Sequence, residues 1–111
     1  MNRSSPAASD RDHSILPEAW HYEIIGVRLE LAPEDGGEPF LDLTLRRGAD
    51  RRTLRFFRPK DLEIEKGGPV SGGLRIVDVS SRQLDNLGVR VDDFEATPGS
   101  LRFWARDVVS I

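Results

Sequence analysis

The chain has 111 residues, a formal net charge of −3 and no cysteine. This length suits one domain with one modest core. The missing cysteine excludes thiol nucleophiles, disulfide frameworks, CxxC redox pairs and thiolate zinc sites. The net negative charge gives no general attraction to nucleic acids or acidic membranes.

The first 14 residues are polar and show no periodicity. They predict a disordered tail over 1–14, followed by a single β domain over 15–111. The start of the chain lacks the apolar stretch of a secretory signal, and no window approaches the roughly 18 apolar residues of a membrane span. We therefore expect a cytoplasmic protein without membrane contact.

From Trp20 onward, apolar and polar residues alternate, as in Val27, Leu29 and Leu31. This period of two is typical of antiparallel strands with one buried and one solvated face. Turn-rich segments separate the alternating stretches. The sequence predicts six or seven short strands at about 20–31, 40–47, 53–58, 61–65, 74–79, 89–96 and 101–109.

Two local features interrupt the alternation. At Gly26 the apolar parity of the first strand changes, which predicts a β-bulge or a bend. Between residues 80 and 88, serines suited to an N-cap precede Leu84 and Leu87, which are spaced for one helical face. We expect one short helix near 80–88, ending at Gly88 in the position after the last helical turn.

Loop lengths predict the strand registers. A four-residue loop at 48–51 would pair Leu45 with Leu54 and Leu43 with Phe56, although it also sets Arg47 against Arg52. A four-residue loop at 97–100 would pair Phe94 with Phe103, Glu95 with Arg102 and Arg90 with Asp107. The fold class that follows is all-β, a small antiparallel sandwich or partly open barrel.

The stretch 46–60 holds seven basic residues and one acid. On the expected hairpin, Arg46, Arg55 and Phe57 project from the solvated face, and Arg58 follows them. Such a surface could bind nucleic acid through phosphate contacts and base stacking, or could meet an acidic protein partner. The alternative is that these arginines pair with Asp42, Asp50 and neighbouring acids.

The last strand offers a second candidate surface. Phe103 should enter the core, so that Trp104 shares the other side with Arg102 and Arg106. If both sides of this strand are covered, Trp104 belongs to a second apolar layer. If not, it is an exposed aromatic flanked by arginines, a composition enriched in protein interfaces.

No motif identifies a catalytic or metal centre. The glycines of 67–73 lack the lysine and helix of a phosphate-binding loop. The acids Asp92, Asp93 and Glu95 could serve a carboxylate-based hydrolase, but cross-strand pairing with arginine explains them as well. The acids around Glu34 lie in a turn and should be solvated. His21 lacks the partners of a triad or a zinc site, so no metal and no cofactor is expected.

In size, acidity and lack of a catalytic set, the chain is similar to small bacterial single-domain β proteins, including the immunity partners of toxins. This resemblance transfers no site residue. The sequence favours a non-catalytic protein-interaction module that binds a protein partner or forms a homodimer. Nucleic-acid binding through 46–60 and the carboxylate-based hydrolase are the alternatives.

Overall fold

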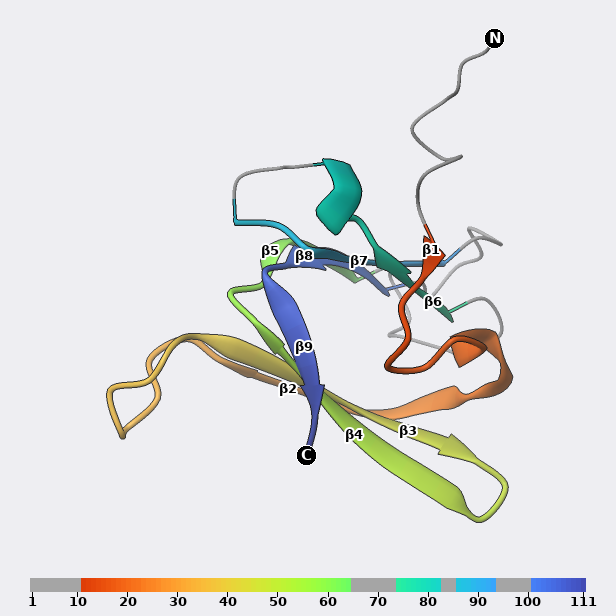
Figure 1. Cartoon of the computed structure of the whole chain (residues 1–111). Helices are drawn as coiled ribbons and strands as arrows, with labels where there is room; N and C mark the ends of the chain where they lie inside the picture. Colours follow the sequence, from red (N-terminus) through yellow and green to blue (C-terminus); the bar gives the residue numbers. More distant parts are fainter. Residues whose placement is uncertain (1–10, 65–73, 83–85, 94–100) are drawn as a thin grey trace, which may run out of the picture.

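The computed structural model of the chain describes residues 11–64, 74–82, 86–93 and 101–111. In this part of the chain, nine strands form two antiparallel sheets that lie one above the other (Figure 1). The strands are β1 (Arg11–Asp12), β2 (Glu23–Glu30), β3 (Phe40–Arg47), β4 (Asp50–Phe57), β5 (Lys60–Ile64), β6 (Leu74–Asp78), β7 (Val89–Asp93), β8 (Leu101–Ala105) and β9 (Asp107–Ser110).

The five-stranded sheet has the order β1-β6-β7-β8-β5, and the four-stranded sheet has the order β2-β3-β4-β9. This arrangement confirms the predicted all-β, sandwich-like fold. There are nine strands instead of six or seven for two reasons. The predicted tail contributes β1, and the predicted strand 101–109 divides at Arg106 into β8 and β9, which belong to different sheets. Among the described residues, no helix is long and apolar enough to cross a membrane.

The core lies between the sheets because alternate side chains of each strand point inward. Leu41, Leu43 and Leu45 of β3 are fully buried, as are Phe56 of β4 and Phe103 of β8. The two phenylalanine rings meet edge to face, with centroids 5.0 Å apart and an interplanar angle of 88°. One ring comes from each sheet, so this pair joins the two layers at the centre of the core.

Two short segments carry the chain from one sheet to the other. Arg58 and Pro59 connect β4 with β5, and Arg106 alone connects β8 with β9. Arg58 adopts a left-handed backbone conformation with φ of 53°. The backbone N–H of Arg106 donates to the carbonyl of Phe57 at 2.9 Å, which holds the two segments side by side. We call this region the corner, since sharp bends of this kind move strands between packed sheets.

The predicted tail is wrong for residues 11–14, while residues 1–10 lie outside the described part of the chain. Arg11 and Asp12 pair with Asp78 and Val77 as β1. The N–H of His13 continues this pairing with a 2.8 Å hydrogen bond to the carbonyl of Ile76. Lack of periodicity over two or three residues therefore did not indicate disorder: these residues satisfy backbone groups along the edge of β6.

The predicted register of the β3–β4 hairpin is wrong by two residues. Leu43 pairs with Leu54, and Arg47 pairs with Asp50. The turn has only two residues, and its first, Gly48, has φ of 59°, as a type II′ turn requires. This turn replaces the unfavourable Arg47–Arg52 pair with one of opposite charge. The shift is even, so each side chain keeps its predicted face.

The register predicted for the β7–β8 hairpin is wrong by three residues. Arg90 pairs with Trp104 instead of Asp107, and Val91 pairs with Phe103. Because the shift is odd, Asp92 instead of Asp93 shares a face with Arg102. The predicted pairs at Phe94 and Glu95, and the glycine-rich segment 67–73, lie outside the described residues.

The bulge expected at Gly26 is confirmed by a register shift between Ile24 and Gly26 in the β2–β3 pairing. The predicted helix near 80–88 appears as a single 3₁₀ turn, η2 (Ser80–Arg82), while residues 83–85 are not described. The left-handed position belongs to Asn86, with φ of 57°, and not to Gly88. Gly88 instead allows a close approach of two backbone segments, because a Cβ there would lie 2.5 Å from the carbonyl oxygen of Arg106.

Candidate partner-binding surfaces

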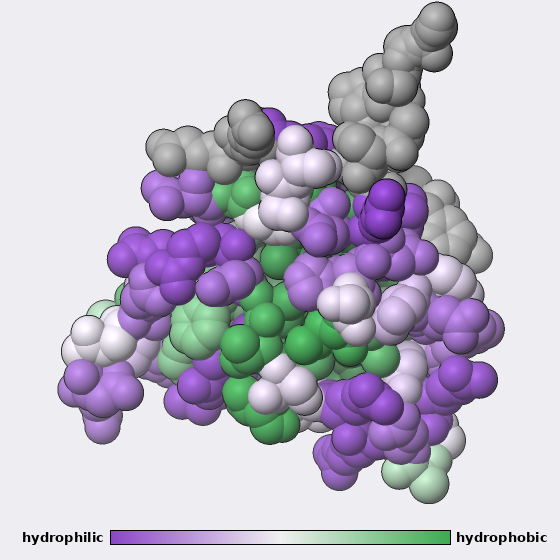
Figure 2. All heavy atoms as spheres, viewed as in Figure 1, coloured by the Kyte–Doolittle hydropathy of each residue, from purple (hydrophilic) through white to green (hydrophobic). Residues whose placement is uncertain are grey.

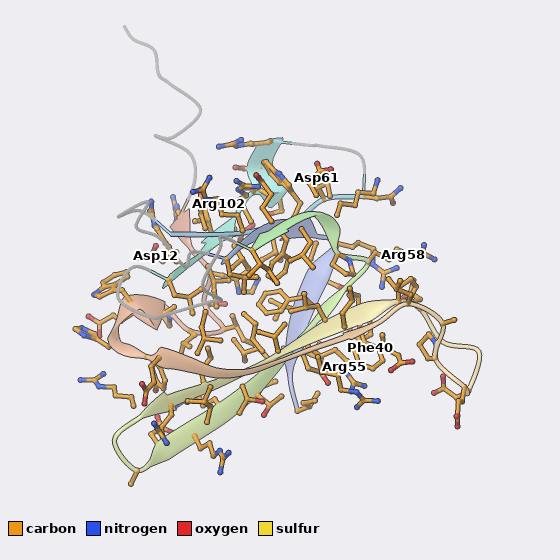
Figure 3. The ribbon with its side chains drawn as sticks, turned by 180° about the vertical axis from the view of Figure 1, so that it is seen from behind. Asp12, Phe40, Arg55, Arg58, Asp61 and Arg102 are labelled. Carbon is orange, nitrogen blue, oxygen red and sulfur yellow. The ribbon has the colours of Figure 1, made fainter. Side chains whose placement is uncertain are left out.

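The seven residues predicted to bind a partner fall in three places. Arg46 and Arg55 lie on the outer face of the four-stranded sheet. Phe57, Arg58 and Arg106 meet at the corner. Arg102 and Trp104 lie on the outer face of the five-stranded sheet, and Figure 3 shows Arg102 on the side of the molecule opposite Arg55. The seven predicted residues therefore do not form one continuous surface.

On the outer face of the four-stranded sheet, Arg55 lies over Phe40 (Figure 3), and it also binds Asp42. Its Nε and Nη2 donate to the two carboxylate oxygens of Asp42 at 2.8 and 3.0 Å. Its guanidinium carbon stands 3.8 Å from the centroid of the Phe40 ring, and Arg28 lies over the same ring at 5.7 Å. The pairing raises the pKa of Arg55. Asp42 is buried, so moving Arg55 away would leave its carboxylate charge without compensation.

Acidic residues surround this pair of arginines. An open hollow of about 460 Å³ lies over Phe40, and its rim includes Glu30, Glu34 and Asp35. Along the same face, the Nε of Arg46 donates to Glu23 at 2.8 Å. At the β3–β4 turn, Arg52 contacts Asp50 at 3.3 Å. Pairing with Asp42, Asp50 and neighbouring acids, the alternative left open by the sequence, is thus observed for several of these arginines.

At the corner, Glu38 binds two arginines at once. Arg106 donates to both of its carboxylate oxygens, with Nη2 at 2.6 Å from Oε2, and the Nε of Arg58 donates to Oε1 at 2.9 Å. These hydrogen bonds, led by the one from Arg106, lower the pKa of Glu38 to about 2. The expectation that the turn acids are all solvated is wrong for Glu38, which ties both crossing segments to the loop between β2 and β3.

The binding of Glu38 by Arg58 and Arg106 predicts how the free energy of unfolding changes at low pH. Because the pKa of folded Glu38 lies below its ordinary value of 4.5, its stabilising contribution is complete above about pH 4.5 and is lost as the pH falls toward 2. We expect Glu38→Gln to be less stable at pH 7 and to lose less stability than the unmodified chain between pH 4.5 and 2. Urea unfolding at a series of pH values measures both effects. Glu34→Gln, on the exposed part of the same loop, is the control, and identical pH profiles for Glu38→Gln and the unmodified chain would contradict the assignment.

The outer face of the five-stranded sheet centres on Trp104. Arg90 lies directly opposite it on β7, with its guanidinium carbon 4.6 Å from the ring centroid, and Lys60 lies opposite it on β5. Trp104 keeps partial exposure, so the strand is not covered by a full second apolar layer. Asp92 contacts Arg90 at 3.6 Å and Arg102 at 3.5 Å. This member of the predicted acid cluster is therefore held in ion pairs, while the side chains of Asp93 and Glu95 are not described.

A fourth surface, absent from the predicted site residues, is the outer edge of β2. Among the described strands, β2 pairs only with β3, and its other side has no strand neighbour. Val27 and Leu29 stand beside the fully buried Leu43 and Leu41 on the inner face, yet remain 37% and 41% exposed, and Leu31 is 71% exposed. Figure 1 shows the reason: the far part of β2 and β3 extends beyond the other sheet. The alternation of Val27, Leu29 and Leu31 predicted a buried face but contained no signal that β2 lies at an edge.

A smaller apolar area lies at the other edge of this sheet. Figure 2 shows apolar residues gathered at the middle of one face of the molecule, around β9. Near the end of the chain, Val109 and Ile111 are 41% and 58% exposed. Both fall on the outer face, because Val109 pairs with Arg55 and Ile111 bonds to the backbone of Thr53.

Within the described residues, no group of three or more histidine, aspartate or glutamate side chains is placed to hold a metal ion. The chain was also compared with protein-family models, with curated proteins and with solved structures, and none of the three comparisons found a match. The candidate surfaces are therefore judged on their geometry and chemistry alone.

Proposed function

We propose that this chain is a non-catalytic, cytoplasmic protein-interaction module that binds its partner along the edge of β2. The observation that carries this proposal is the row of exposed apolar side chains on an edge strand of eight residues. An edge strand presents backbone N–H and C=O groups that can pair with another strand, and exposed apolar residues beside it add buried area when a partner binds.

Natural edge strands are usually protected, which makes the composition of β2 informative. Proteins shorten such strands, place charges pointing inward, or insert bulges to prevent pairing with other chains. The bulge of β2 lies between Ile24 and Gly26 and leaves the stretch from Val27 to Glu30 in regular register with β3. The inward-facing positions of this stretch hold valine and leucine, which favour contact with a partner over its prevention.

The arginine clusters support the proposal less than the edge does. The arginines of the predicted site that contact carboxylates of the same chain are Arg46, Arg55, Arg58, Arg102 and Arg106. A partner that recruited one of these arginines would have to replace an existing ion pair, which costs most where the carboxylate is buried, as at Asp42.

Site-specific photocrosslinking in the cells that make the protein tests the proposal. We expect p-benzoylphenylalanine at position 29 to give a discrete covalent adduct with a partner on illumination. The same probe at position 51, where Arg51 is exposed on the outer face of the same sheet, serves as the matched control and should give none. Absence of any discrete adduct from positions 27, 29 and 31 would refute binding along this edge.

The alternative, nucleic-acid binding through 46–60, requires arginines that phosphates can reach. Arg47 and Arg51 are exposed near the β3–β4 turn, although Arg47 pairs across the strands with Asp50. Titration with single- and double-stranded oligonucleotides at low and high salt separates the two functions. Salt-sensitive binding that Arg47→Ala and Arg51→Ala abolish would favour the alternative.

A further inference from the structure

The exposed stretch of β2 and the residue after it are complementary to themselves. The sequence reads Val27-Arg28-Leu29-Glu30-Leu31, in which the charges are opposite in sign on the two sides of a central leucine. The side chains of Val27 and Leu29 face the core side of the sheet, and those of Arg28 and Glu30 face outward beside Asp42 and Phe40. Two such stretches placed antiparallel would present like faces to each other.

Among the antiparallel registers centred on Arg28, Leu29 or Glu30, all of which keep the faces matched, the charges favour the one centred on Leu29. With Leu29 opposite Leu29 of the second copy, Arg28 lies opposite Glu30 twice and Val27 lies opposite Leu31 twice. Moving the centre to Arg28 sets two guanidinium groups against each other, and moving it to Glu30 does the same with two carboxylates. Opposite charges across strands stabilise a pair, and like charges destabilise it.

The other sheet edges are less suited to this kind of pairing. β5 carries Lys60, Asp61 and Glu63 and contains a register shift, and Asp61 is in a left-handed conformation with φ of 54°. β1 has only two residues and β9 has four. Charge, irregularity and short length are the features by which edges avoid association. Of the edges that the structure describes, β2 is therefore the one best suited to pair with another strand.

We infer that the partner of β2 is a second copy of this chain, bound antiparallel with Leu29 opposite Leu29 across a two-fold axis. This inference rests on the proposed function and specifies its partner. The two four-stranded sheets then form one continuous eight-stranded sheet. The apolar side chains of Val27, Leu29 and Leu31 become covered by their counterparts, in the isologous contact that two-fold symmetry requires.

Single cysteines test the register directly, because the chain contains none of its own. We expect purified Leu29→Cys to form a disulfide-linked dimer under mild oxidation, since opposite residues in antiparallel strands meet the distance a disulfide needs. Val27→Cys is the matched control. Its two copies would lie four positions apart, or roughly 13 Å, and should not crosslink. An equimolar mixture of Val27→Cys and Leu31→Cys should crosslink. Equal crosslinking of Leu29→Cys and Val27→Cys would overturn the register.

Exchange of charge provides a second test that does not require oxidation. We expect Glu30→Arg to weaken the dimer about tenfold or more in sedimentation equilibrium, because the introduced arginine of each copy then faces Arg28 of the other. Arg28→Glu should weaken the dimer similarly. A mixture of the two variants should restore association, because both pairs across the strands are then of opposite charge. The introduced arginine faces the introduced glutamate, and Arg28 of one variant faces Glu30 of the other. Circular dichroism verifies that both variants fold, and a mixture that stays monomeric would contradict the inference.

The outcomes distinguish this inference from the function on which it rests. A purified chain that is monomeric at all concentrations, together with a photocrosslinked adduct to a different protein at position 29, would overturn self-pairing and keep the β2 edge as a binding site. Failure of both the crosslinking in cells and the dimerisation would overturn both. An adduct of twice the mass of the chain would support both.

Discussion

Replacing Phe103 by alanine is expected to lower the free energy of unfolding by about 3–5 kcal/mol. Phe103 is fully buried, and its ring meets that of Phe56 edge to face at the centre of the core. Truncation removes the transfer free energy of the ring and leaves a cavity bordered by strands of both sheets. Those strands are fixed by cross-strand hydrogen bonds and cannot easily collapse into it. Urea unfolding monitored by circular dichroism measures the loss.

Val109→Ala is the matched control for this prediction. Val109 is apolar and also lies in a strand, but it is 41% exposed on the outer face, so its truncation should cost less than about 1 kcal/mol. Comparable losses for the two variants would show that the aromatic contact between the sheets is not the centre of the core.

Gly88→Ala is expected to destabilise the fold by about 1–3 kcal/mol, the usual range for an added group in a tightly packed position. An added Cβ would stand 2.5 Å from the carbonyl oxygen of Arg106, and that oxygen belongs to backbone that cannot rotate away. Gly88 also donates to the carbonyl of Ala105 and accepts from the N–H of Val79, both at 3.0 Å. Relief of the overlap would therefore disturb hydrogen bonds on both sides of it.

Gly26→Ala provides the comparison, because the nearest atom to a Cβ at Gly26 is the Cβ of Thr44 at 3.4 Å, an ordinary contact. Thermal unfolding should show a clear loss for Gly88→Ala and little change for Gly26→Ala. If both glycines tolerate alanine equally, the close approach at Arg106 is not a constraint on the fold.

Sequence reasoning located the strands well because burial of one face imposes a period of two. It placed β3 at its observed bounds and the bulge at Gly26. It failed on pairing, because a register depends on the turn, and a two-residue turn at Gly48 competes with a four-residue one in the same stretch. The two-residue register error in β3–β4 left each side chain on its predicted face. The three-residue error in β7–β8 placed Asp92 instead of Asp93 on the same face as Arg102.

The candidate sites depended on tertiary placement that no local pattern contains. Arg46, Arg58 and Arg106 are basic residues in polar contexts, and their pairing with Glu23 and Glu38 follows from how the strands and the corner meet. Glu38 could have been suspected only from an excess of nearby arginines. The sequence pattern also did not indicate that β2 lies at an edge, since apolar and polar residues alternate in the same way in an edge strand and a central one.

The corner has a consequence for how the molecule opens. Since β4 continues into β5 and β8 into β9, and Glu38 binds both crossing segments, the two sheets are covalently continuous and tightly joined on one side. Elsewhere the core is covered by Leu16, Ala19 and Tyr22, which follow β1 in a single stretch near the start of the described chain. Local unfolding that exposes the core would therefore begin with detachment of that stretch, while the sheets stay joined at the corner until global unfolding.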